Sequence, residues 1–105
     1  MKITSLKVGA RTFHVKPWAF KDAEDDGAVG KMLLRTGDIL IAEGHPDDST
    51  ADTILHESLH AILGEMGMGW SHDDEERFVA LFCPRLTAFM ADNPGAVKEL
   101  LRMLR

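Results

Sequence analysis

The sequence of 105 residues contains no tyrosine and a single cysteine, Cys83. One cysteine excludes an intramolecular disulfide and is typical of a protein from a reducing compartment. No apolar run approaches the length of a membrane-spanning helix, and the N-terminal residues show no apolar segment typical of a signal peptide. These features predict a cytoplasmic protein without membrane contact.

Basic residues are also few, with 12 lysines and arginines against 17 acidic residues and a net charge of −5. No cluster of positive charge is visible along the chain, so neither nucleic acid nor an anionic membrane is an expected partner. The length and the 45% hydrophobic share are those of one globular domain, residues 1–105.

The first half of the chain, residues 1–45, has mainly the pattern of β-structure. Apolar positions alternate around two turn candidates, Gly9-Ala10 and Thr36-Gly37. Pro17 is expected to end the second strand, and the acidic residues 20–30 are expected to form a loop. Antiparallel strands are therefore expected over residues 2–8, 11–16, 31–35 and 38–42.

The second half has helical periodicity, which predicts three helices over residues 50–66, 72–91 and 94–105. Ser49-Thr50-Ala51-Asp52 has the spacing of a capping box for the first helix. Gly64 lies inside that helix, where a glycine indicates that another group approaches closely. Pro84 is expected to kink the second helix. The fold class is thus α+β, with a small antiparallel sheet or hairpins followed by three helices.

The most informative stretch is His56-Glu57-Ser58-Leu59-His60, inside the first of these helices. Positions four residues apart lie on one helix face, so His56 and His60 point the same way. Two such imidazoles can bind one Zn²⁺, and Glu57 can act as the general base on the attacking water.

A catalytic zinc site usually has a third protein ligand. The candidates are the acids and the histidine that follow the first helix: His72, Asp73, Asp74, Glu75 and Glu76. A helical wheel places Glu75 near the centre of the apolar stripe of the second helix and Glu76 roughly 90° away, on the shoulder that faces the two histidines. The predicted third ligand is therefore Glu76, with Glu75 as the first alternative.

The run HESLHAILGEMGM, followed by EERFV and then DNP, resembles small HExxH proteins of phages and prophages. These are minimal relatives of the zincin metallopeptidases, akin to the ImmA/IrrE-type group. The resemblance implies a zincin-like fold, zinc bound by His56, His60 and an acid on the next helix, and Glu57 as the catalytic glutamate. It implies a hydrolase that cleaves a peptide or protein substrate, with the strand at residues 38–42 offering an edge to an extended peptide.

Other interpretations stay open at the level of sequence. The zinc site can serve as a non-catalytic staple of a small domain or as part of a protein–protein contact. The histidines can also be ordinary residues on the polar edge of a helix in a metal-free interaction protein. The lack of tyrosine leaves His72, His45 and Arg77 as candidates for stabilising an oxyanion, and the sequence selects none of them.

Overall fold

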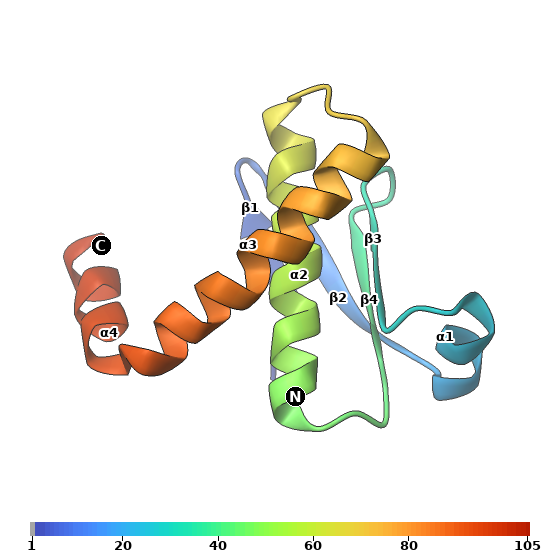
Figure 1. Ribbon diagram of the computed structural model, residues 1–105, viewed down its shortest axis with the longest axis horizontal. Helices are drawn as coiled ribbons and strands as arrows, with labels where there is room; N and C mark the ends of the chain where they lie inside the picture. The colour runs from blue at the N-terminus through green and yellow to red at the C-terminus, as the bar shows by residue number, and fades with distance from the viewer. Residues whose placement is uncertain (1) are drawn as a thin grey trace.

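The computed structural model describes residues 2–105 and has an α+β architecture in which the sheet belongs to the N-terminal half (Figure 1). The strands are β1 (Ser5–Val8), β2 (Arg11–Trp18), β3 (Gly30–Leu33) and β4 (Asp38–Ala42). The helices are α1 (Phe20–Asp26), α2 (Asp47–Met66), α3 (His72–Asp92) and α4 (Pro94–Met103). Three helices therefore follow the sheet, as predicted.

The four strands form one sheet in the order β1-β2-β4-β3. The pairs β1–β2 and β3–β4 are antiparallel, which confirms both predicted hairpins. The central pair β2–β4 is parallel, with Val15 opposite Ile39, so the expectation of a purely antiparallel sheet was wrong. A parallel pairing needs a crossover, and here α1 and β3 return the chain to the end of the sheet where β2 began.

Two local expectations before β3 were wrong. Strand β2 continues through Pro17, where it pairs only with β4, because its pairing with β1 ends at His14. A proline is tolerated where one side of a strand lacks a partner. Residues 20–26 form the helix α1 and not a loop, since Ala23 is buried and Gly27 ends the helix in a left-handed conformation at φ 74°.

Helix α2 begins at Asp47, three residues before the predicted start. Asp47 and Asp48 occupy its first turn, where negative charge interacts favourably with the helix dipole. Ser49 consequently lies inside the helix, so the predicted capping box does not form. Helix α3 begins close to its predicted position, and the Ser71 hydroxyl accepts a hydrogen bond from the Asp74 backbone N–H at its start.

Helix α2 lies between the sheet and α3 and packs on both (Figure 1). On the sheet side, Ile54 and Ala61 contact a cluster of buried strand residues: Val8, Phe13, Val15, Ile39 and Ile41. On the other side, Leu63 packs against Val79 and Cys83 of α3. Cys83 is thus a small buried apolar residue, as is common for a free cysteine.

The close approach expected at Gly64 is present. A Cβ atom at this position would lie 3.1 Å from a methyl group of Leu34, in the turn between β3 and β4. The absence of a side chain therefore lets α2 lie close to this hairpin. Pro84 lies inside α3 without ending it, and the predicted kink stays a prediction. In residues 2–105, no helix has both the length and the apolar character needed to cross a bilayer.

Candidate metal centre

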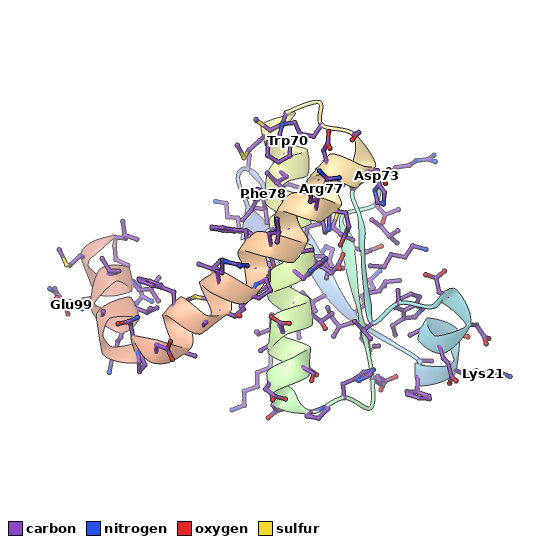
Figure 2. The ribbon with its side chains drawn as sticks, viewed as in Figure 1. Lys21, Trp70, Asp73, Arg77, Phe78 and Glu99 are labelled. Carbon is purple, nitrogen blue, oxygen red and sulfur yellow. The ribbon has the colours of Figure 1, made fainter. Side chains whose placement is uncertain are left out.

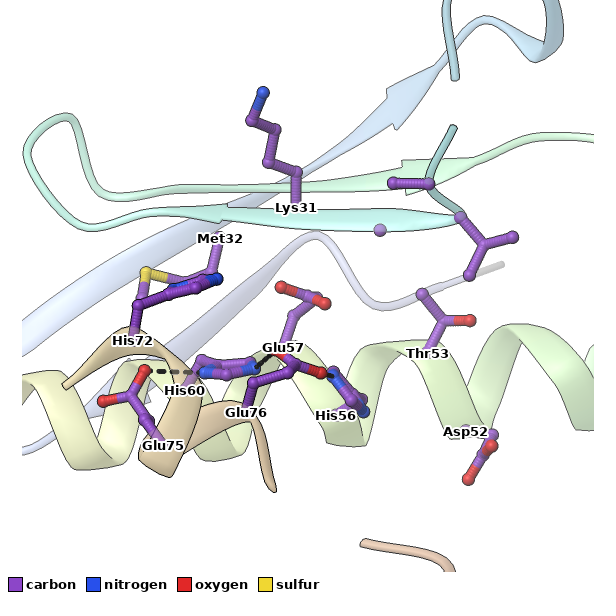
Figure 3. Close-up of a pocket in the computed structure, with 13 residues that line it drawn as sticks. Lys31, Met32, Asp52, Thr53, His56, Glu57, His60, His72, Glu75 and Glu76 are labelled. Carbon is purple, nitrogen blue, oxygen red and sulfur yellow. Dashed lines mark hydrogen bonds and ion pairs between the residues drawn. The ribbon is translucent and has the colours of Figure 1, made fainter. Parts of the chain in front are cut away.

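A pocket of about 530 Å³ lies where α2 faces strand β3 and the first turns of α3 (Figure 3). Its polar lining consists mainly of the residues singled out from the sequence: His56, Glu57, His60, His72, Glu75 and Glu76. The opposite wall is formed by β3 and the residues before it. Three separate segments of the chain therefore meet at one place.

Glu76 lies between the two histidines of α2. One carboxylate oxygen of Glu76 is 3.1 Å from Nε2 of His56, and the other is 2.8 Å from Nε2 of His60. The imidazole rings are 5.1 Å apart between centroids, as expected for neighbours one helical turn apart. His56, His60 and Glu76 thus direct donor atoms to a common point, and these atoms lie within 4.8 Å of one another.

Glu75 contacts the same imidazole from its other side. Its carboxylate is 2.7 Å from Nδ1 of His60 (Figure 3). A carboxylate on one ring nitrogen fixes the tautomer and orientation of a histidine and leaves the other nitrogen free to bind a metal. Glu75, which the helical wheel placed near the centre of the apolar stripe, therefore orients the His60 ring. Its carboxylate does not reach the point where the donor atoms of His56, His60 and Glu76 meet.

Glu57 is buried and points from α2 toward β3 (Figure 3). Burial raises the pKa of its carboxyl group, and the charge of Glu76 also raises this pKa. The nearby His56 and His60 and the Met32 backbone N–H act in the opposite direction. The net effect is a raised pKa, so Glu57 takes up a proton more readily than a carboxyl group in water does. This suits a group that must accept and later release a proton.

Close packing holds Glu57 against the sheet. A Cβ atom at Gly30 would lie 2.5 Å from a methyl group of Thr53 and 3.1 Å from Cγ of Glu57. Only glycine fits between β3 and α2 at this position. The sequence interpretation missed the part that β3 plays in the site. The available signal was Gly30, which directly precedes a run typical of a β-strand. The sequence interpretation assigned this glycine to the loop over residues 20–30.

The donor set suits a metal ion. Two imidazole nitrogens and a carboxylate oxygen are common ligands of Zn²⁺, and tetrahedral coordination separates ligand atoms by about 3.3 Å. The two oxygens of Glu76 lie 3.1 Å from Nε2 of His56 and 2.8 Å from Nε2 of His60, and one donor atom from each residue lies within 4.8 Å of the others. The three residues could therefore bind a metal ion with small side-chain movements.

The remaining candidates divide clearly by position. His72 lines the pocket, whereas Asp73 and Asp74 do not. His45 lies before α2 with its ring tilted against that of Phe20, and Arg77 lines a separate depression beside Trp70 and Phe78. Of the three side chains considered for an oxyanion, only His72 lies at the site.

Comparison with known proteins gives no relative: no family model, no curated protein and no solved structure matches this chain.

Proposed function

We propose that the protein is a zinc-dependent hydrolase of peptide or amide bonds, with the zincin-like arrangement that the HExxH stretch predicts. One observation carries the proposal: His56, His60 and Glu76 converge while the buried Glu57 lies in the same pocket. His56 and His60 would bind the zinc ion through Nε2, and Glu76 would supply the third ligand. The resemblance to small phage HExxH proteins belongs to the same proposal.

Zinc at this position would supply a Lewis acid that polarises the scissile carbonyl and favours ionisation of water. Glu57 takes the proton of the attacking water and later passes it to the leaving amine. Glu75 keeps the His60 ring oriented. His72 lines the pocket on the α3 side and is the group best placed to donate a hydrogen bond to the developing oxyanion.

The substrate would bind as an extended peptide along β3. The sequence suggested residues 38–42 for this role, but β4 pairs with β2 on one side and β3 on the other, so that suggestion was wrong. Strand β3 is one of the two outer strands of the sheet, and Gly30, Lys31 and Met32 line the pocket (Figure 3). A peptide added to this edge would pass beside Glu57.

A zinc site that only stabilises the fold is the second candidate. It is favoured by the small apolar contact between α2 and α3, whose buried members among residues 2–105 are Leu63, Val79 and Cys83. Zinc bound by residues of both helices would join them, and small domains often need such a link.

The variant Glu57→Gln separates the two candidates. In the hydrolase, it keeps stoichiometric zinc but lowers the rate of cleavage by about 100-fold or more, because the proton acceptor is lost. Zinc content is measured by elemental analysis, and cleavage by mass spectrometry on unfolded casein and a mixed peptide library. Zinc-loaded wild-type protein that cleaves none of these substrates, with a melting temperature that falls on chelation, would favour the structural role.

A further inference from the structure

The C-terminal part of the chain exposes an apolar helix face. No residue of α3 beyond Cys83 and no residue of α4 is fully buried. Val97, Leu100, Leu101 and Leu104 follow one face of α4, and Leu101 and Leu104 are 53% and 82% exposed. We call these four residues the α4 apolar face. Figure 1 shows α4 at the far end of α3, away from the sheet, and Figure 2 shows Glu99 at this remote end.

The molecule exposes more surface than a chain of its size normally does. Its accessible surface is 7416 Å². A folded monomer of 11.6 kDa is expected to expose about 5,800 Å². The radius of gyration is 14.2 Å, against about 12.9 Å expected for this length. The excess of about 1,600 Å² lies in the range that each chain of an obligate dimer buries.

A groove suited to a helix lies on the same molecule, between the first half of α2 and the second half of α3. It has a volume of about 610 Å³. Its lining includes small or apolar side chains, which allow a helix to approach closely: Ala51, Leu55, Pro84, Ala88, Met90 and Ala91. Figure 1 shows α3 crossing α2 and diverging from it toward α4, so the two helices separate where the groove lies.

The charges of the groove and of α4 are opposite. Asp48 and Asp52 line the groove, and Asp47 adds a third acid in the first turn of α2. Helix α4 and the residues after it carry Lys98, Arg102 and Arg105 against one acid, Glu99, which pairs with Arg102 within the helix and leaves a net positive charge. Complementary charge beside complementary apolar surface is the pattern of a specific interface.

We propose that two copies of this chain form a symmetric dimer in which α4 of each copy lies in the α2–α3 groove of the other. The α4 apolar face then covers Leu55 and the small residues of the partner's groove, while Lys98 and Arg102 meet its acidic rim. Each copy contributes one helix and one groove, so the same contact is made twice and the assembly is closed. The metal pocket lies on the β3 side of α2 and shares only Asp52 with the groove.

The first test is the mass of the purified full-length chain by sedimentation equilibrium. The wild-type protein is expected to have twice the monomer mass of 11.6 kDa at micromolar concentration. Leu101→Glu combined with Leu104→Glu should raise the dimer dissociation constant by at least about tenfold, because two charges enter an apolar contact. Phe20→Gln is the matched control, because Phe20 is 55% exposed but lies on α1, and it should leave the mass unchanged.

The second test reverses charges and does not depend on the apolar variant. Asp47→Lys with Asp48→Lys in one protein, and Lys98→Glu with Arg102→Glu in another, should each weaken self-association by about tenfold. An equimolar mixture should form a heterodimer about as tightly as wild type, because one of its two helix–groove contacts keeps the native charges and the other has both reversed.

Wild-type protein that stays monomeric up to about 100 µM would overturn the proposal. A dimer that is unaffected by the changes at Leu101 and Leu104 would also overturn it. Failure of the charge-reversed proteins to recover association in the mixture would reject the pairing of α4 with the acidic groove.

Discussion

Two neighbouring carboxylates, Glu75 and Glu76, contact the same histidine on different ring nitrogens. Glu76 lies 2.8 Å from Nε2 of His60, and Glu75 lies 2.7 Å from Nδ1. Successive residues of a helix point about 100° apart, so these two side chains approach the ring from different directions. In the proposed site, Glu76 binds the metal ion and Glu75 orients its ligand His60.

This difference predicts a graded loss of zinc affinity. Glu75→Ala should weaken binding by about 10–100-fold, as expected for a group that orients a ligand. Glu76→Ala should weaken it further, because a ligand itself is lost. The affinity is measured by competition with a chelating dye. Glu65→Ala is the control, since Glu65 lies on α2 but contacts Arg11, away from the site.

The reverse order of the two effects would contradict the assignment of Glu76 as the ligand. The helical wheel placed Glu76 toward the histidines because shoulder positions of two packed antiparallel helices face each other. The contact of Glu75 with Nδ1 was not predictable in this way. It depends on the rotation of the His60 ring and on how α3 crosses α2, and neither is encoded in the local sequence.

At the scale of elements, the two hairpin turns were predicted correctly, whereas the parallel strand pair, α1 and the start of α2 were not. Gly9 and Gly37 have positive φ in the two predicted hairpin turns. A turn depends on a few adjacent residues and can be predicted from them. The parallel pairing of β2 with β4 joins residues more than twenty positions apart, and α1 is held partly by the burial of Ala23. Both depend on tertiary contacts that no local pattern contains.

The parallel pair gives a prediction for pH dependence. Lys16 of β2 lies 3.0 Å from Asp38 at the start of β4. The hydrogen bond from Lys16, helped by Thr36, lowers the pKa of the Asp38 carboxyl below its usual value of 3.8. A lowered folded-state pKa stabilises the protein above the unfolded-state value, and this contribution is lost as the pH falls through the folded-state pKa.

Asp38→Asn should therefore lower the free energy of unfolding at about pH 7, and the difference from wild type should shrink below about pH 4. Urea denaturation of the metal-free protein, with a chelator present, measures both. In a Lys16→Met background the same substitution should have a smaller effect, because the main partner is gone. A difference between Asp38→Asn and wild type that is constant from neutral to acid pH would reject this role.

At the scale of the whole molecule, α2 is the central helix, because both the sheet and α3 pack on it. One side of the helix covers the sheet, another packs on α3, and the histidines lie on the edge between them. The periodicity of the sequence predicted this helix and placed His56 and His60 beside its apolar face. It also predicted α4 as amphipathic, but an apolar stripe does not specify what covers it. In the described structure, no residue of α4 is buried by another part of the same chain.

The metal content of the purified chain tests the central claim most directly. After dialysis against zinc and then against metal-free buffer, elemental analysis should find about one zinc ion per wild-type chain, and a similar amount in Glu57→Gln. His56→Ala combined with His60→Ala should retain almost none. Wild-type protein that binds no more zinc than the double variant would contradict the convergence of His56, His60 and Glu76 on a metal ion, and with it the proposed function.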